Sequence, residues 1–294
     1  MNQKEVLAKA SEYLSTFKDT VIDVLEITEP PDQEYAIHLA KTVSKLSPLV
    51  GNMIEYQVCA ELNKLDWNGL GEWERQDPGF PDTIFKSNFE YQPGIEIKTW
   101  FPNATEITAR FKDSVSFFDN EQINVAVVAW LPENIIYGKP KIIDIWTWSA
   151  KSLANARDSH YHKPPSYIVL EPEDTSLRTS NLQQTNTNGY KFQGSMVELA
   201  EAKKMVLEFG DFYENYSSEK LYQDLTKRLF KSFPYRLDTN FAKIDRIMHP
   251  SLEEFKKRVL LTEMNGHTIK HWSHLLGQKN KDIMQLIREL LPAR

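Results

Sequence analysis

The period of the hydrophobic pattern changes near Trp73, and this change restricts the folds that the chain can adopt. Before Trp73, apolar residues recur at helical spacing; after it, they form short runs of period two bounded by Gly, Pro and Asn, which are typical of strands. The run from Asn124 to Trp130 is apolar after its first residue, as expected of a central strand covered on both faces. Helical patterns return after Ser195 and continue to Leu291. This order predicts an α/β (α+β mixed) fold with a central mixed β-sheet flanked by helices.

Five segments carry the strand pattern. They are Asp82–Lys86, Gly94–Thr99, Ile123–Leu131, Ile142–Trp148 and Tyr167–Leu170. The segment Thr105–Lys112 alternates strictly between apolar and polar residues, which makes it a candidate for a further strand.

Three helices are expected before the strands. Gln3–Phe17 is rich in helix formers, Pro30-Pro31-Asp32 is a start signal for a helix that runs to about Leu46, and Ser47-Pro48 starts the third. One apolar stripe of the third helix faces a core; it consists of Val50, Ile54, Val58, Leu62 and Leu65. Glu55 lies at the edge of that stripe.

The best candidate for a domain boundary is Phe209–Glu219, where Gly, Asn and Ser interrupt the helical pattern. We therefore expect one domain over residues 1–210 and a helical, basic C-terminal region over 211–294, which is either a separate domain or part of the first. Residues 221–294 contain 14 Lys and Arg against 8 Asp and Glu, a net +6, which leaves −12 for residues 1–220 of the total −6. The total net charge of −6 argues against a protein that is held to nucleic acid by bulk electrostatic attraction alone.

Composition also narrows the compartment. With 41% hydrophobic residues, the chain can bury a full-sized core. Its most apolar uncharged run, Gln122–Pro132, is far shorter than the roughly 20 residues that cross a bilayer. The start of the chain lacks the apolar region of a secretory signal, and the single Cys59 forms neither an intrachain disulfide nor a cysteine-based zinc cluster. We expect a cytoplasmic protein without a membrane span.

The residues best suited to chemistry lie on two consecutive predicted strands. In Gly94–Thr99, Glu96 and Lys98 project from one face of the strand. If Asp82–Lys86 pairs antiparallel with this strand and Asp82 lies opposite Lys98, then Asp82, Glu96 and Lys98 share that face. A slip of one residue would send Asp82 to the other face.

Two carboxylates this close favour a cation between them, and hard oxygen ligands with room for water suit Mg²⁺. An adjacent ammonium can polarise an attacking water or stabilise charge on a phosphate. The alternative is an amphipathic strand with an ordinary Glu/Lys pair at an edge that faces water, and the tripeptide Glu-x-Lys alone does not exclude it.

The whole constellation resembles the PD-(D/E)XK nuclease superfamily. A helix with an acidic residue, Glu55, is followed by Pro81-Asp82 at the start of a strand and by Ile95-Glu96-Ile97-Lys98 on the next one. The resemblance covers residues 48–130 and implies a restriction-endonuclease-like core. It makes Asp82, Glu96 and the carbonyl of Ile97 ligands of Mg²⁺, and Lys98 the catalytic lysine. Glu55 would support a second metal or a metal-bound water; alternatively it is a solvated helix residue.

Within the superfamily, the chain length and Thr99 after the lysine look most like a type II restriction endonuclease that acts as a homodimer. Such an enzyme hydrolyses double-stranded DNA to 5′-phosphate and 3′-hydroxyl ends. Thr99, Asn103, Arg110 and Lys112 follow the catalytic strand, and we expect them to contact the DNA backbone near the cut.

A polar segment, Arg178–Gln193, is the candidate for base recognition. No carboxylate occurs between Asp174 and Glu198, and amide side chains can bond to adenine while Arg or Lys contacts guanine or phosphate. Asn188-Gly189 is a hairpin signal. The candidate DNA contacts are Arg178, Asn181, Gln183, Gln184, Asn186, Asn188 and Lys191. A polar surface loop without a partner is the alternative.

Other functions compete with a sequence-specific endonuclease. One is a structure-selective repair or recombination nuclease of the same superfamily. Another is a DNA-binding module without catalysis, in which Glu96 and Lys98 are structural. A third is a glycoside hydrolase that uses Asp82 and Glu96 as acid and base, which leaves Lys98 without a role.

Overall fold

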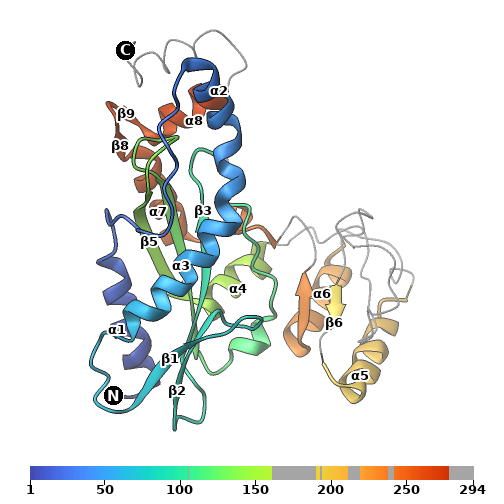
Figure 1. Cartoon of the computed structure of the whole chain (residues 1–294). Coiled ribbons are helices and arrows are strands. Elements are labelled where there is room, and N and C mark those ends of the chain that lie inside the picture. Colours follow the sequence, from blue (N-terminus) through green and yellow to red (C-terminus); the bar gives the residue numbers. More distant parts are fainter. Residues whose placement is uncertain (105, 161–189, 193, 211–218, 238–241, 278–294) are drawn as a thin grey trace. The chain divides into compact units, whose positions relative to one another are not determined.

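A computed structural model describes residues 1–104, 106–160, 190–192, 194–210, 219–237 and 242–277 (Figure 1). The chain divides into two compact units. The first contains residues 1–107, 122–148 and the part of the chain from Pro250, and the second contains 108–121 and 149–249. The expected boundary between residues 210 and 211 therefore does not coincide with this division. No helix in the described ranges has the length and apolar character needed to span a bilayer.

The first unit has a mixed five-stranded sheet of order β1-β2-β3-β4-β5. The strands are β1 (Gly71–Arg75), β2 (Thr83–Ser87), β3 (Gly94–Trp100), β4 (Ile123–Pro132) and β5 (Pro140–Ser149). β1, β2 and β3 are antiparallel neighbours, whereas β3 and β4 run parallel. The expected α/β architecture with a mixed sheet and flanking helices is confirmed, and so are the four predicted strands within this unit.

The predicted central strand forms the middle of the core. β4 lies between β3 and β5, and nine of its ten residues are buried. Its short connection to β5, residues 133–139, suits antiparallel neighbours, whereas the parallel step from β3 to β4 requires the long connection 101–122. Part of that connection, with η2 (Val115–Phe118), belongs to the second unit.

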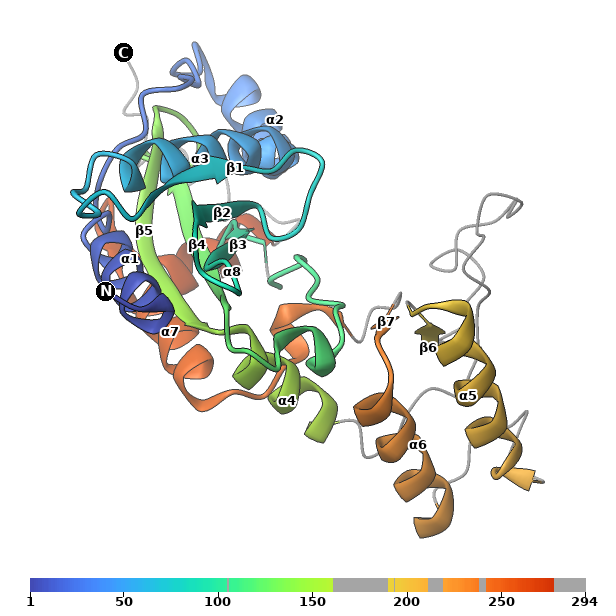
Figure 2. The same cartoon turned by 90° about the horizontal axis from the view of Figure 1, so that it is seen from below.

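Helices cover both faces of the sheet (Figures 1 and 2). The helices of the first unit are α1 (Gln3–Ser15), α2 (Gln33–Thr42), η1 (Val43–Leu46), α3 (Ser47–Leu62), α7 (Pro250–Leu261) and α8 (Ile269–Gly277), and β8 (Glu263–Met264) pairs with β9 (His267–Thr268). α3 packs at Gly51 against Thr99 of β3, whereas Phe255 of α7 packs against Trp100, whose side chain points to the other face.

The helix starts agree with the sequence signals. Asp32 caps α2, because its Oδ1 accepts a hydrogen bond from Tyr35 N at 2.8 Å. α3 begins at Ser47 with Pro48 in its first turn, as expected, and ends at Leu62, so Leu65 lies beyond the helix. The predicted buried stripe of α3 is confirmed from Val50 to Leu62.

The second unit is mainly helical in its described part. It contains η2, α4 (Ala150–His160), α5 (Met196–Leu207), α6 (Lys220–Ser232), η6 (Ile244–Arg246) and the two-stranded ladder of β6 (Tyr190–Phe192) with β7 (Tyr235–Leu237). Leu199 and Val206 of α5 share one buried cluster with Tyr222 and Leu229 of α6. Strand β7 interrupts the helical pattern that we expected to run from Ser195 onward.

The further strand proposed for Thr105–Lys112 is wrong for the described residues of that segment. Ile107 and Phe111 are buried, so the alternation does mark an inward face. However, the backbone forms only an isolated bridge, between Arg110 and Lys243, and no ladder. Burial alone therefore produced the period-two pattern. The expected strand Tyr167–Leu170 lies outside the described residues.

Candidate active site

The pairing between β2 and β3 is short and ends at the candidate site. Thr83 lies opposite Ile95, and continuing this register by one residue sets Asp82 opposite Glu96. The expected pairing of Asp82 with Lys98 is therefore wrong by two residues, although the antiparallel direction is confirmed. Because side chains alternate with a period of two, a two-residue shift keeps Asp82 on the face of Glu96 and Lys98.

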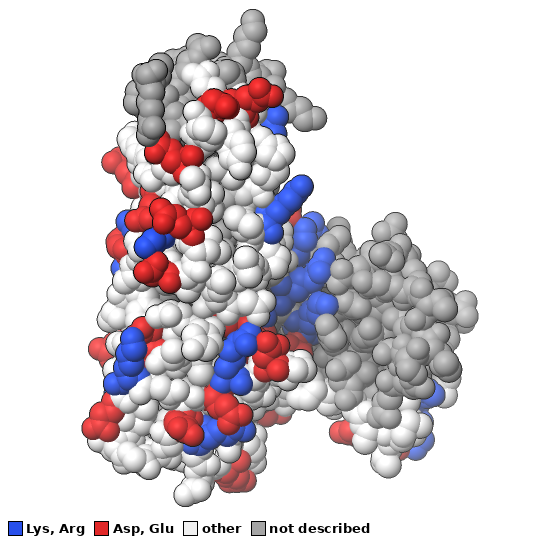
Figure 3. Space-filling view, viewed as in Figure 1, with Lys and Arg blue, Asp and Glu red and all other residues white. Residues whose placement is uncertain are grey.

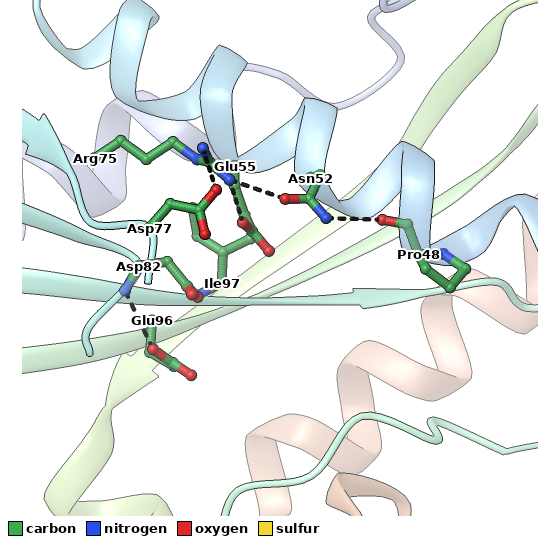
Figure 4. A network of polar contacts seen from close by, with 8 residues as sticks. All are labelled: Pro48, Asn52, Glu55, Arg75, Asp77, Asp82, Glu96 and Ile97. Atoms are coloured by element: carbon green, nitrogen blue, oxygen red, sulfur yellow. Dashed lines mark hydrogen bonds and ion pairs between the residues drawn. The ribbon is translucent and has the colours of Figure 1, made fainter. Parts of the chain in front are cut away.

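Asp82 joins the two strands where their ladder stops (Figure 4). Its Oδ2 accepts a hydrogen bond from Ile97 N at 2.6 Å, and its own N–H donates to Glu96 Oε2 at 3.2 Å. A strand residue directs its N–H and C=O to the same edge, so the Ile97 carbonyl faces the edge at which Asp82 lies. The four residues that the sequence connected, Asp82, Glu96, Ile97 and Lys98, are thus adjacent in space.

Glu96 and Lys98 form an ion pair on β3. The Glu96 residue is only 6% exposed, and a buried carboxylate is costly unless a positive charge or hydrogen bonds compensate it. Lys98 supplies that charge from a position two residues further along the strand, and Asp82 N supplies a hydrogen bond. The Lys98 side chain remains partly exposed, so its ammonium lies at the boundary between protein and solvent.

Glu55 approaches the same edge from α3, and Figure 4 shows its carboxylate pointing toward Asp82 and Ile97. Burial raises the pKa of Glu55, and the negative charge of Asp82 raises it further. The hydrogen bond and charge of Arg75 and the charge of Lys98 act in the opposite direction. Glu55 therefore belongs electrostatically to the group formed by Asp82 and Lys98, and it is not a fully solvated helix residue.

Sequence reasoning missed Arg75, the last residue of β1. Its Nη2 contacts Glu55 Oε2 at 3.4 Å and donates to Asn52 Oδ1 at 2.9 Å, while Nη1 lies 2.9 Å from Asp77 Oδ2 (Figure 4). Its contacts with Asn52 and Glu55 join a strand to a helix, so no local pattern in the sequence indicated them. Arg75, Asn52 and Asp77 form a polar rim beside Glu55. A hollow of about 360 Å³ opens there, and Tyr56 and Met53 of α3 also line it.

Two of the expected DNA contacts lie in the first unit. Thr99 faces α3, because a Cβ added at Gly51 would lie 3.1 Å from Thr99 Oγ1. Asn103 follows β3, and its side-chain Nδ2 and Oδ1 are buried without a hydrogen-bond partner in the described part of the chain. A buried amide without hydrogen bonds is energetically costly. Of Thr99 and Asn103, Asn103 is therefore the better candidate for contact with a ligand.

The remaining expected contacts are placed in the second unit or lie outside the described residues. Arg110 and Lys112 belong to the second unit. Lys191 lies in β6, opposite Arg236 of β7. Arg178, Asn181, Gln183, Gln184, Asn186 and Asn188 lie outside the described residues, as does the hairpin signal Asn188-Gly189. Their DNA contacts stay predictions.

Charge on the first unit is mixed. On the face shown in Figure 3, acidic and basic side chains both occur, and several basic side chains gather near the middle of the view. Among the described residues, no three His, Cys, Asp or Glu side chains converge closely enough to hold a metal ion by themselves. Any ion at Asp82 and Glu96 would therefore need backbone, water or substrate oxygens as further ligands.

Comparisons with protein-family models, with curated proteins and with solved structures find no match for this chain. The features of this chain that bear on function are its fold and the geometry at Asp82, Glu96, Ile97 and Lys98.

Proposed function

We propose that this chain is a Mg²⁺-dependent, sequence-specific endonuclease of double-stranded DNA, with its active site at the end of the β2–β3 pairing. The observation that carries the proposal is the contact of Asp82 with Ile97 and Glu96 beside the Glu96–Lys98 ion pair. Two carboxylates and an ammonium meet where two strands separate, and Glu55 approaches from the covering helix. This is the arrangement that the resemblance to PD-(D/E)XK nucleases implies.

The donor set fits Mg²⁺. This ion is usually bound by one or two carboxylates and keeps several waters, with substrate phosphate oxygens as further ligands. Asp82, Glu96 and the Ile97 carbonyl would hold it, and Glu55 would bind one of its waters. When bound, Mg²⁺ supplies positive charge for the scissile phosphate and lowers the pKa of water.

The protein groups have distinct roles in the proposed hydrolysis. The Lys98 ammonium donates hydrogen bonds to the attacking water and to a non-bridging phosphate oxygen, which stabilises the charge that develops there. Asp82 is held in place by Ile97 N, so its carboxylate needs no reorganisation. Water forms the new P–O bond and gives up a proton to the solvent as the bond to the 3′ oxygen breaks, and the 3′ oxygen takes up a proton from the solvent. The products are a 5′-phosphate and a 3′-hydroxyl.

A type II restriction endonuclease that acts as a homodimer is the form of this activity that we favour. A two-fold symmetric dimer would cut a palindromic site on both strands. The buried amide of Asn103, which follows the strand that carries Lys98 and has no hydrogen-bond partner among the described residues, supports a ligand at this end of the sheet. Base recognition is assigned to Arg178–Gln193 from sequence alone.

Cleavage of phage DNA tests the proposal. The wild-type chain should give discrete fragments with Mg²⁺ and none with EDTA. A smear, or cutting only at branched or damaged DNA, would favour the structure-selective nuclease instead. Binding without cleavage under every metal condition would favour the non-catalytic DNA-binding module, and activity on glycosides in EDTA would favour the glycoside hydrolase.

A further inference from the structure

A cavity of about 580 Å³ lies within the second unit and has no role in the proposed cleavage. Residues of η2, α4 and α6 line it. Its volume falls within the range of pockets that enclose small molecules, roughly 300 to 1,000 Å³. The side chains that line it define the chemistry of a ligand.

Two lysines of α6 give the cavity an uncompensated positive charge. Lys227 and Lys231 both line it, both are exposed, and neither has an ionic or hydrogen-bond partner in the described part of the chain. They are four residues apart, so they lie on the same face of the helix. Like charges at this spacing destabilise a helix, and an anion bound between them would remove the repulsion.

The carboxylates that line the cavity are already neutralised. Asp119 Oδ1 lies 3.4 Å from Lys151 Nζ, which also donates to the Asp119 carbonyl. Asp158 Oδ1 lies 2.7 Å from Nε of Arg157, a residue that is 1% exposed and whose Nη1 donates to two backbone carbonyls. Among the described residues that line the cavity, an anion therefore meets the two ammonium groups of Lys227 and Lys231 without an opposing free carboxylate.

The rest of the lining suits a ligand that is larger than an inorganic anion. Asn155, one turn after Lys151 on α4, has no hydrogen-bond partner in the described residues, so its amide can donate and accept. Phe230 lies three residues after Lys227 on α6. It is mostly buried and forms an apolar wall of the cavity together with Val115. A planar apolar group can pack on this wall while an anionic group binds the lysines.

We infer that this cavity binds a nucleoside phosphate. The phosphate lies between Lys227 and Lys231, the base packs on the wall formed by Phe230 and Val115, and Asn155 bonds to a polar edge of the base or sugar. The nucleotide is either free or part of a DNA strand; the first source is independent of the proposed nuclease function, and the second rests on it.

Isothermal titration of the full chain in EDTA tests the inference without involving the proposed metal site. The probes are dAMP, inorganic phosphate and deoxyadenosine. We expect dAMP to bind about tenfold more tightly than either fragment, because it alone fills both parts of the cavity. The double variant Lys227→Gln/Lys231→Gln should weaken dAMP binding about tenfold or more. The matched control is Lys220→Gln, on the same helix but outside the cavity, and it should bind like wild type.

A second titration separates the two sources of nucleotide. A short single-stranded oligonucleotide and a short duplex, both labelled with a fluorophore, are bound in EDTA by wild type, the double variant and Lys220→Gln. If dAMP affinity falls in the double variant, the free nucleotide is a ligand. If only the affinity for an oligonucleotide falls, the ligand is a nucleotide within a strand. Equal affinities of the double variant and Lys220→Gln for every probe would overturn the inference.

The Lys98→Ala variant separates nucleotide binding at this cavity from the proposed nuclease activity. This variant should bind dAMP as wild type does even though it is expected not to cleave DNA. Loss of dAMP binding in Lys98→Ala would place the nucleotide at the candidate active site and would also overturn the inference. Thermal unfolding by circular dichroism shows whether each variant keeps its fold, which we expect because the substituted α6 lysines are exposed.

Discussion

Glu55 shows at the scale of one residue how the fold prepares a charged site. The carboxylate of Glu55 is partly buried beside Asp82. Burial raises the pKa of Glu55, and the negative charge of Asp82 raises it further. Arg75 offsets part of the cost of burying this charge, because its Nη2 lies 3.4 Å from Glu55 Oε2. Sequence could supply Glu55 as a candidate, because the helical stripe places it at an edge. It could not supply Arg75, because contacts between a helix and a strand do not follow from local pattern.

Replacing Glu55 by Gln should alter the dependence of stability on pH. The folded state resists ionisation of Glu55, so wild-type stability falls as pH rises from the ordinary glutamate pKa of about 4.3 through the raised folded value. The Glu55→Gln variant has no carboxyl group at this position, so its stability does not fall for this reason. The free energy of unfolding of the variant minus that of wild type should therefore increase from about pH 4 to about pH 7.

Urea unfolding at the two pH values measures this difference. Glu72→Gln, at an exposed position of β1, is the matched control and should show no comparable change. A difference that shrinks as pH rises would mean that the folded protein favours ionised Glu55, and it would contradict the crowding of negative charge at this edge.

Asp82 should control DNA affinity through its charge. Without metal, Asp82, Glu55 and Glu96 place negative charge where a phosphate must bind, so wild type should bind its target weakly in EDTA and more tightly with Ca²⁺. Asp82→Asn should recover about tenfold in affinity in EDTA, or about 1.4 kcal/mol, because one charge is removed. Glu90→Gln, in the exposed β2–β3 turn, should behave as wild type. Equal affinities in EDTA and Ca²⁺ for wild type and Asp82→Asn would show that these carboxylates do not face DNA.

At the scale of elements, the sequence predicted most of the strands and helix starts that position the site. It failed where the same hydrophobic pattern is compatible with more than one structure. The strands β2 to β5 and the starts of α2 and α3 carry strong local signals. β1 was missed because Trp73 is its only buried residue, so it shows little alternation. The register of β2 and β3 was wrong by two residues, because such a shift leaves every side chain on its face and hence leaves no trace in the period.

Gly94 fixes the approach of β2 to β3, so substituting it tests the role of that pairing. A Cβ at Gly94 would lie 2.3 Å from Pro81 Cγ and 3.2 Å from the Thr83 carbonyl oxygen. Gly94→Ala should cost about 1 to 3 kcal/mol of stability, because the strands must separate. Displacing Asp82 from Glu96 should also lower the cleavage rate on the order of a hundredfold.

Thermal unfolding and cleavage of one DNA substrate, measured on the same preparations, check this expectation. Gly277→Ala is the control, because a Cβ there meets nothing within 4 Å among the described residues and should change neither quantity. If Gly94→Ala keeps wild-type stability and rate, the close approach of Pro81 to β3 does not hold the site.

At the scale of the whole molecule, the two units interrupt one another along the chain. α7 returns to the first unit after the second, because Phe255 packs on Trp100, Arg258 Nε bonds to Asp144 Oδ2 at 3.1 Å, and Ser251 Oγ accepts from Trp146 Nε1 at 3.0 Å. Local sequence could not show this return, since a helical pattern does not record which unit the helix packs against. The expected division at residue 210 followed an interruption of the helical pattern, which does not record tertiary partners.

The central claim is that Asp82, Glu96 and Lys98 form an active site that hydrolyses DNA, and the rate of cleavage in a single turnover with Mg²⁺ tests it most directly. Lys98→Ala and Asp82→Ala should each reduce the rate at least on the order of a thousandfold while thermal unfolding remains cooperative. Lys86→Ala, at an exposed position of β2, should cut at the wild-type rate. Near-wild-type cleavage by either Lys98→Ala or Asp82→Ala would contradict the account.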